Sequence, residues 1–443
     1  MKTIIIGGVA AGMSAASKIK RSDKNAEVIV YEKGSHISYG ACGLPYFVSD
    51  VNNDWNKMIA RTKEQFESQG ISVKLHHEVV KVFPESKKLI IRNLDTEDFV
   101  IDYYDKLMIS TGAASVIPNI PGTWLKGVHV LKNIEDGIAL KEAVMSSSVK
   151  DVIVVGGGYI GIEVVEAMVE LKKNVCCIEA ADRILASFDT EMAELARNEI
   201  EKHGVNIHTG EKVGELIGTE YVEGVKTDKG MYKADLVILA IGVRPSTAFL
   251  KDTGIQMAPN GAIVVDRELR TSIPDIWAAG DCALVYHRGM EENTYLALGT
   301  VANKCGRIAG GNICGRHDKF IGALGSAAIK VLDIEMGRTG MSENDAKRLG
   351  INYSTIMVNA NDHPAYYPNP TPLTIKLLYE KGTKRILGAQ AAGTKGAVMR
   401  IDAIAIAIHS KLSTDELGMV DLCYAPPFAG VWDAIHIACN AAK

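Results

Sequence analysis

Short runs of mostly apolar residues, each ending at a glycine, recur along the first two thirds of the chain. The run 3–6 enters a glycine-rich turn, a helix of small residues follows over 13–20, and a second strand is expected over 27–32. The stretch 152–179 repeats this order, with its helix over 159–170. Apolar runs without alternation are typical of strands buried on both faces of a parallel sheet, so each stretch is predicted to be a βαβ unit.

Three later apolar strands also end at glycines, over 104–113, 234–242 and 275–281. From about residue 321 the pattern changes to alternating strands, such as 373–379 and 385–391, followed by an apolar helix over 400–409. The predicted fold is α/β, with two Rossmann-like dinucleotide-binding domains and a C-terminal α+β domain with an antiparallel sheet. The first nucleotide domain is expected to be split over 1–115 and 245–320, the second covers 116–244, and the C-terminal domain covers 321–443.

Composition excludes several classes of function. The length of 443 residues fits roughly three domains at about 150 residues each, and the net charge of −4 gives no reason to expect nucleic acid or a membrane surface as partner. No apolar run reaches the about 18 residues of a membrane span. The N-terminus lacks a signal-peptide cleavage site, so a cytoplasmic location is expected. Eight cysteines without any C-x-x-C pair indicate neither a disulfide framework nor a metal centre.

The clearest chemical motif is Gly156-Gly157-Gly158-Tyr159-Ile160-Gly161, which follows a predicted strand and opens a helix. In such a turn the glycines permit a tight bend, close approach of a pyrophosphate and close packing of helix on strand. Glu179 lies 18 residues after Gly161 at the end of the next strand, where its carboxylate can accept from a ribose hydroxyl. Glu179 favours NADH because it would repel the 2′-phosphate of NADPH, and the nearby Arg183 softens that preference.

The first glycine turn is Gly7-Gly8-Val9-Ala10-Ala11-Gly12, with valine where the fingerprint has its second glycine. Glu32, 20 residues after Gly12, nevertheless ends the following strand and supports a ribose contact. The late motif Gly280-Asp281 offers a carboxylate to a ribityl hydroxyl of a flavin. Two nucleotide folds together with this motif predict that one binds FAD and the other NADH or NADPH.

The residues expected to contact these cofactors belong to the glycine turns and strand ends. They are Gly7, Gly8, Ala10, Ala11, Gly12, Glu32, Lys33, Thr111, Gly112, Gly156, Gly158, Tyr159, Ile160, Gly161, Glu179, Gly242, Gly280 and Asp281. Tyr159 is either a gate for nicotinamide access to the flavin or a packing residue, and both interpretations stay open.

Cys42 differs from the other cysteines because it lies just ahead of a probable helix start at Leu44-Pro45. Proline is tolerated in a first helical turn, and a helix N-terminus lowers the pKa of a thiol and makes it a nucleophile. The alternative is a buried structural cysteine. A C-x-x-x-x-C dithiol is excluded because position 47 is Phe47. The oxidised form must therefore be a mixed disulfide with a small thiol, a persulfide or a sulfenic acid.

Over nearly its whole length the chain resembles the single-cysteine branch of the pyridine nucleotide-disulfide oxidoreductases. This branch contains coenzyme A-disulfide reductases, NADH oxidases, NADH peroxidases and persulfide or polysulfide reductases. The resemblance is carried by the two glycine turns and by the stretches 37–42, 278–281 and 424–428. It implies a split FAD domain, an NAD(P)H domain and a C-terminal dimerisation domain, and therefore a homodimer.

The resemblance also narrows the sub-branch. Peroxidases and water-forming oxidases have a histidine beside the flavin where this chain has Ala10, whereas coenzyme A-disulfide reductases have a small residue there. The latter also share the stretches Tyr366-Tyr367-Pro368 and Tyr424-Ala425-Pro426-Pro427. Tyr366 and Tyr424 are thereby implied to reach across the dimer toward the active cysteine, where a phenol can donate to a leaving thiolate. The alternative is that both are packing aromatics.

Four further positions match the contacts of that subfamily with coenzyme A, and they are Ser14, Lys18, Arg21 and Ser38. Lys18 and Arg21 are three residues apart on one helix and so share a face, although ordinary solvated cations are the alternative interpretation. The chain departs from the family at Tyr39-Gly40-Ala41, where Phe-x-x and an Asn or Pro before the cysteine are frequent. This departure leaves the disulfide substrate open.

The function predicted from the sequence is NAD(P)H-dependent reduction of coenzyme A disulfide, or of a related small disulfide or persulfide, through FAD and Cys42. Coenzyme A is a possible resident adduct on Cys42 as a mixed disulfide. The main alternative is an NADH oxidase that reduces oxygen to peroxide or water. A thiol-independent reductase for a small redox protein and a non-catalytic flavoprotein acting as sensor or scaffold also stay open.

Overall fold

The two apolar runs singled out in the sequence form the central strands of two parallel sheets in the computed structural model, which describes residues 1–443. The first sheet has the order β18 (Ile276–Ala278), β7 (Lys106–Ile109), β1 (Lys2–Ile6), β2 (Glu27–Tyr31) and β3 (Ile71–Lys74). Ile4 and Ile5, which point to opposite faces of β1, are both completely buried. Both faces of this sheet are therefore covered, which explains the uninterrupted apolar run.

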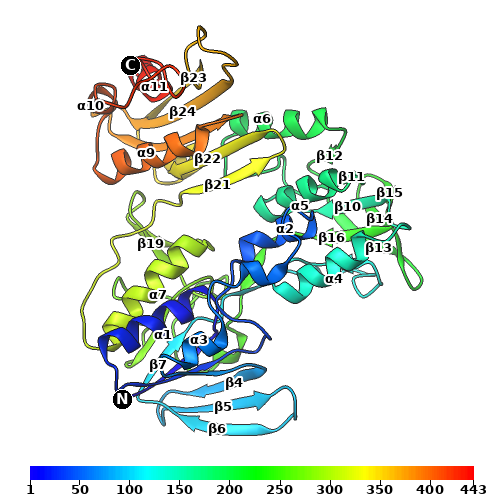
Figure 1. Ribbon diagram of the computed structural model, residues 1–443, viewed down its shortest axis with the longest axis vertical. Coiled ribbons are helices and arrows are strands. Elements are labelled where there is room, and N and C mark those ends of the chain that lie inside the picture. The colour runs from blue at the N-terminus through cyan, green and yellow to red at the C-terminus, as the bar shows by residue number, and fades with distance from the viewer.

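The second parallel sheet repeats the first around β10. Its order is β12 (Asn206–His208), β11 (Asn174–Ile178), β10 (Asp151–Val155), β16 (Leu236–Leu239) and β9 (Val128–His129). In each sheet the central strand leads through a glycine turn into a helix, α1 (Ala10–Ser22) after β1 and α5 (Tyr159–Glu170) after β10. The two predicted βαβ units are confirmed. Figure 1 shows α1 of the first unit in the lower part of the view and α5 of the second unit toward the upper right.

The segment after residue 275 returns to the first sheet, because β18 pairs with β7 and helix α7 (Gly299–Ile313) packs along α1. The two helices touch closely at glycines of α7. A Cβ atom on Gly306 would lie 2.2 Å from the carbonyl oxygen of Ala11, and one on Gly310 would lie 2.6 Å from that of Ala15. Residues nearly 300 positions apart in the sequence therefore build one core.

The C-terminal part is an antiparallel sheet covered by helix α9 (Ala397–His409), as the change of pattern predicted. The order of its strands is β21 (Ala327–Val331), β22 (Ile334–Gly340), β25 (Ile386–Gly393), β24 (Pro372–Glu380) and β23 (Tyr353–Asn361). The predicted fold class, two nucleotide-binding folds and a C-terminal α+β domain, is confirmed.

Shorter elements connect these sheets and cover their edges. Two small antiparallel sheets consist of β4 (His77–Phe83), β5 (Lys88–Asn93) and β6 (Phe99–Tyr103), and of β13 (Val213–Gly218), β14 (Val222–Thr227) and β15 (Met231–Lys233). Two strand pairs are β8 (Ala113–Ser115) with β17 (Val243–Pro245), and β19 (Val285–His287) with β20 (Glu292–Thr294). The remaining helices are α2 (Leu44–Val48), α3 (Lys63–Glu67), α4 (Ile134–Val144), α6 (Thr190–Lys202), α8 (Glu343–Arg348), α10 (Thr414–Leu417) and α11 (Ala434–Ala441). None of the helices combines the length and the apolar character that crossing a bilayer requires.

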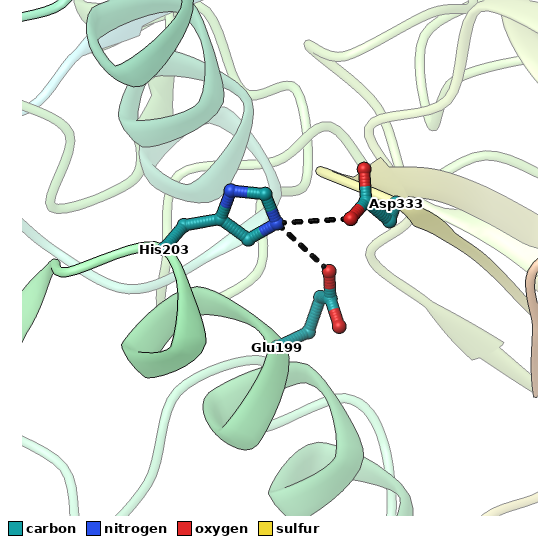
Figure 2. Close-up of side chains that lie close together, drawn as sticks. All are labelled: Glu199, His203 and Asp333. Atoms are coloured by element: carbon teal, nitrogen blue, oxygen red, sulfur yellow. Dashed lines mark hydrogen bonds and ion pairs between the residues drawn. The ribbon is translucent and has the colours of Figure 1, made fainter.

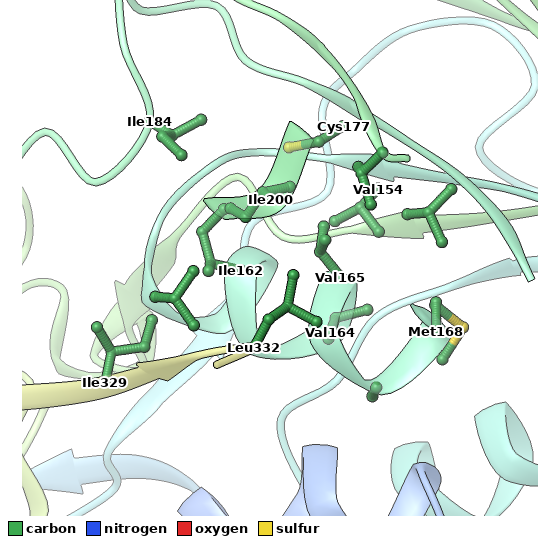
Figure 3. Packing of buried hydrophobic residues seen from close by; sticks show 14 of the residues in the cluster. Val154, Ile162, Val164, Val165, Met168, Cys177, Ile184, Ile200, Ile329 and Leu332 are labelled. Atoms are coloured by element: carbon green, nitrogen blue, oxygen red, sulfur yellow. The ribbon is translucent and has the colours of Figure 1, made fainter. Parts of the chain in front are cut away.

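The largest hydrophobic cluster, with 31 buried residues, joins three parts of the chain. Ile162 and Val164 of α5 lie beside Ile329 and Leu332 of the C-terminal sheet (Figure 3). Leu44, the first residue of α2, belongs to the same cluster. The short helix that follows Cys42 is therefore fixed by the same core that joins the second nucleotide fold to the C-terminal domain.

Replacement of Gly306 by alanine tests the close contact between α1 and α7. The added Cβ would meet the carbonyl oxygen of Ala11 at 2.2 Å, and overpacking of a core typically costs about 1–3 kcal/mol. Gly306→Ala should lower the urea midpoint of unfolding of the holoenzyme by a corresponding amount. Gly299→Ala is the matched control, because it lies on the same helix with no atom near its added Cβ. Equal urea midpoints for the two variants would show that the close packing of α7 on α1 at Gly306 does not contribute to stability.

Candidate functional site

The two glycine turns have the same local geometry. A Cβ atom on Gly12 would lie 1.9 Å from the carbonyl oxygen of Gly7, and a Cβ atom on Gly161 would lie 1.9 Å from that of Gly156. Gly7 and Gly156 both have positive φ angles, +95° and +110°. Gly158, in contrast, has open space in front of its α-carbon. Its counterpart in the first turn is Val9, so this position has room for a side chain. The valine that replaces the second glycine of the fingerprint therefore leaves the shape of the first turn unchanged.

A carboxylate braces each turn in the same way. Glu32 accepts hydrogen bonds from the backbone N–H groups of Gly8, at 2.7 Å, and Gly34, at 2.8 Å. Glu179 accepts from Gly157, at 2.6 Å, and Ala181, at 2.7 Å. The backbone N–H groups at the starts of α1 and α5 point toward the same two turns and are typical ligands of a pyrophosphate. These features fit one dinucleotide at each turn.

A third set of residues adjoins the first turn at the end of β18. Asp281 follows Gly280 there, and its carboxylate lies 3.1 Å from the ammonium group of Lys132, just before α4. The hydroxyl oxygen of Thr111, just beyond β7, is buried and has no hydrogen-bond partner within the chain. An unsatisfied buried hydroxyl beside an acidic strand end fits a polar ligand such as the ribityl chain of a flavin.

The structure places Cys42 in a single 3₁₀ turn, Ala41–Gly43, directly before α2. Pro45 occupies the first turn of α2, as the sequence predicted. Cys42 is exposed at the surface of the single chain, whereas Cys177, Cys282, Cys305 and Cys439 are buried. The alternative interpretation of Cys42 as a buried structural cysteine is therefore wrong.

The pKa of Cys42 is shifted in the direction opposite to the prediction. Partial desolvation of its sulfur raises the pKa of the thiol, the carboxylate of Glu163 raises it further, and the ammonium group of Lys132 lowers it. The helix that follows has only five residues, Leu44–Val48, so its dipole is short. Desolvation is the largest contribution to this shift, and the carboxylate of Glu163 is the next.

Glu163 itself changes its charge near neutral pH. Burial, and to a lesser extent the neighbouring Glu166, raise the pKa of Glu163 to about 7. Glu166 is held by the ammonium group of Lys330, at 2.6 Å, and by the backbone N–H of Leu332, at 2.8 Å. Analysis of the sequence missed both Glu163 and Lys132. The only available signal was that Glu163 lies one helical turn after Tyr159.

The four positions proposed to contact coenzyme A lie near the start and along the exposed side of α1. Ser14 donates to the side-chain oxygen of Asn303 on α7, at 2.7 Å. The backbone N–H of Ser38 donates to the carbonyl oxygen of Gly8 in the first turn, at 2.9 Å. Lys18 is half-buried and Arg21 is exposed, and neither forms an ion pair with a carboxylate within the chain. Two unpaired cations on one helix face are suited to an anionic ligand.

Tyr366 and Tyr424 are brought together by the structure, with their hydroxyl oxygens 2.8 Å apart. Both are exposed. Tyr366 lies in the loop between β23 and β24, which in Figure 1 is at the far end of the C-terminal domain from α2. Within one chain this tyrosine pair is therefore separate from Cys42.

The chain is similar to known proteins over nearly its whole length. Residues 1–304 match the family described as pyridine nucleotide-disulphide oxidoreductase, and residues 326–435 match its dimerisation domain. An NAD(P)H sulfur oxidoreductase (CoA-dependent) from Pyrococcus abyssi is 36% identical over 99% of this chain and 98% of its own length. An NADH oxidase from Enterococcus faecalis is 33% identical over 100% of this chain and 99% of its own length.

Solved structures extend the comparison. The crystal structure of reduced Bacillus anthracis CoADR-RHD aligns with a TM-score of 0.96 and 34% identity, over 99% of this chain and 79% of that chain.

Replacement of Glu163 by glutamine tests its influence on the thiol. Removal of the carboxylate lowers the pKa of Cys42, so more thiolate is present at a given pH. Because Glu163 is ionised mainly above about pH 7, the gain should appear at and above neutrality and vanish well below it. We expect about two- to fivefold faster alkylation by iodoacetamide at pH 8 in the reduced holoenzyme.

Glu170→Gln is the matched control for this measurement, because Glu170 lies on the same helix and pairs with Lys330 instead. Its alkylation rate should equal that of the wild type. Identical rates for Glu163→Gln and wild type across this pH range would contradict the assigned influence of Glu163.

Proposed function

The chain belongs to the pyridine nucleotide-disulphide oxidoreductase family, and we propose that it uses NAD(P)H to reduce coenzyme A disulfide or a related small disulfide or persulfide. The observation that carries this proposal is the exposed Cys42, whose pKa is influenced by the charges of Lys132, Glu163 and Asp281. Because position 47 is Phe47, Cys42 has no resolving cysteine there and is proposed to exchange with a disulfide of the substrate. The family implies FAD and NAD(P)H as cofactors.

The residues proposed to hold FAD are those of the first turn, with Glu32, Thr111 and Asp281. The second turn and Glu179 are proposed to hold the nicotinamide nucleotide. When bound, the nicotinamide would supply a hydride to the flavin, and the flavin would pass the electron pair on to sulfur. The protein contributes the orientation of these groups and of the Cys42 sulfur.

Cys42 is proposed to act as a nucleophile in thiol–disulfide exchange. Its thiolate attacks one sulfur of coenzyme A disulfide, which forms a mixed disulfide and releases one coenzyme A thiolate. The electron pair from NAD(P)H then cleaves the mixed disulfide, regenerating the Cys42 thiolate and releasing the second coenzyme A as thiolate. Each thiolate that leaves takes up a proton, so one disulfide, one NAD(P)H and one proton give two thiols and NAD(P)⁺.

The cations of α1 support coenzyme A as the acceptor. Lys18 and Arg21 have no carboxylate partner in the chain, and coenzyme A carries several phosphates. Ser14 and Ser38 add hydroxyls near them. These four residues are proposed to bind the nucleotide portion of coenzyme A, which leaves its thiol end free to reach Cys42.

A homodimer is part of this proposal. The exposed apolar residues of the C-terminal domain support it, and they include Met399, Ile406, Met419, Phe428, Val431 and Trp432. Exposed apolar side chains that gather on one face are typical of a protein–protein interface. In such a dimer, Tyr366 and Tyr424 of one chain would serve the Cys42 site of the other, where their phenols donate hydrogen bonds to the leaving thiolate.

An NADH oxidase is the second candidate, and the similarity to the Enterococcus faecalis NADH oxidase favours it. In this reaction oxygen would accept the electron pair and Cys42 would cycle through a sulfenic acid. An oxygen electrode separates the two candidates. Rapid NADH-driven oxygen consumption in the absence of any disulfide would favour the oxidase.

The mass of the intact protein tests the proposal directly. The protein as purified should carry the mass of one coenzyme A on Cys42, and a thiol reductant should remove it. Cys42→Ser should lack the adduct and lose disulfide reduction by at least about a hundredfold, because no other nucleophile is placed there. Cys423→Ser should keep both, and it is the matched control because Cys423 is the other exposed cysteine.

A bare chain, or a chain with only added oxygen, would argue for the oxidase. An adduct that persists in Cys42→Ser and disappears in Cys423→Ser would place the reactive thiol elsewhere.

A further inference from the structure

The segment 184–191 forms one wall of the second glycine turn. The backbone N–H of Leu185 donates to the carbonyl oxygen of Gly157, at 2.8 Å. Ile184 lies against Gly157 so closely that a Cβ atom on that glycine would be 2.7 Å from its side chain. Phe188 follows, with its ring centroid 6.2 Å from that of Tyr159. The position of this segment therefore decides the shape of the proposed nicotinamide site.

The C-terminal domain holds this segment from the other side. The Nη1 group of Arg338, on β22, donates to the carbonyl oxygen of Ser187, at 2.6 Å. The side chain of Gln390 accepts from the backbone N–H of Asp189, at 2.8 Å. Lys376 lies 3.1 Å from the carboxylate of Asp189, and its side chain is only 4% exposed. Buried, charge-assisted contacts of this kind are the strong ones.

A second link between the same two domains lies at the end of α6. The Nε2 atom of His203 is 3.1 Å from carboxylate oxygens of both Glu199 and Asp333 (Figure 2). Lys202 adds a positive charge 3.5 Å from Asp333, so the group is an ion-pair cluster. Asp333 is exposed, and exposed ion pairs contribute little. The buried contacts of Arg338 and Lys376 are therefore the ones that fix the segment.

Three buried polar atoms near this contact have no hydrogen-bond partner in the chain. They are the hydroxyl oxygens of Tyr159 and Ser187 and the Nε group of Arg338. Burial raises the pKa of Tyr159, whereas the side chain of Ser187 and the positive charge of Arg338 lower it. Unsatisfied buried groups at one place are typical of a site whose ligand supplies the partners.

We propose that Arg338 is a positioning residue for the nicotinamide nucleotide. By fixing Ser187 it orients the hydroxyls of Ser187 and Tyr159, and polar groups of the bound nucleotide complete their hydrogen bonds. The C-terminal domain thus sets the nucleotide affinity of the neighbouring domain without any change in the glycine turn. The inference rests on the nucleotide part of the proposed function and is independent of the disulfide acceptor.

Binding of NAD⁺ and NADP⁺ to the FAD-loaded enzyme, measured by calorimetry without any acceptor, tests this inference. Arg338→Met should weaken binding of the preferred nucleotide about tenfold, the size of one charge-assisted hydrogen bond. In turnover the loss should appear in KM for NAD(P)H, with kcat within about twofold of wild type. Arg338→Lys, which keeps the charge and one donor, should restore part of the affinity.

Arg385→Met is the matched control, since Arg385 lies in the same domain and also has a buried Nε without a partner. It should bind nucleotide like the wild type. Ser187→Ala removes only a hydroxyl, so it tests the same inference if the arginine variant does not fold. It should also weaken nucleotide binding, with an unchanged thermal midpoint.

Wild-type affinity in Arg338→Met or in Ser187→Ala would overturn the inference. A wild-type holoenzyme that binds neither nucleotide would overturn the proposed function itself.

Discussion

The contact on which the rest depends is that between the third glycine of each turn and the first. The α-carbons of Gly12 and Gly161 approach the carbonyl oxygens of Gly7 and Gly156 so closely that a methyl group would lie 1.9 Å away. This approach sets each helix directly on the end of its central strand. The N-termini of α1 and α5 are thereby aimed at the space beyond the sheet, where a dinucleotide finds backbone donors and a favourable dipole.

The chemically distinctive residues come from four separate parts of the chain. Cys42 follows the first βαβ unit, and Lys132 lies just before α4. Glu163 lies on the helix of the second unit, and Asp281 follows β18 of the first sheet. The helix α2 that follows Cys42 packs into the core shared by the second fold and the C-terminal domain. The electrostatic result is a thiol whose pKa is raised by desolvation and Glu163 and lowered by Lys132. Its reactivity is therefore governed by groups from distant parts of the chain.

The fold was predictable because its signals are local. Short stretches of sequence contain the apolar runs, the glycine spacing and the acidic residues Glu32 and Glu179 that follow the strands. The structure has both βαβ units at the positions that these signals predicted. Only the site residues that belong to those motifs were predictable from the sequence. Glu163 and Arg338 carry no motif, and their roles arise from contacts across domains. The sequence predicted a lowered pKa for Cys42, and the structure raises it. The prediction was wrong because the helix start is visible in the sequence, whereas the nearby carboxylate of Glu163 is not.

The proposed function requires the sulfur of Cys42 to exchange electrons with the flavin. An anaerobic titration of the protein as purified with NAD(P)H, followed by the visible absorbance of the flavin, tests it most directly. The wild type should consume one more equivalent than Cys42→Ser before the flavin is fully bleached, because its mixed disulfide also takes up an electron pair. Equal consumption by the two proteins would contradict the account.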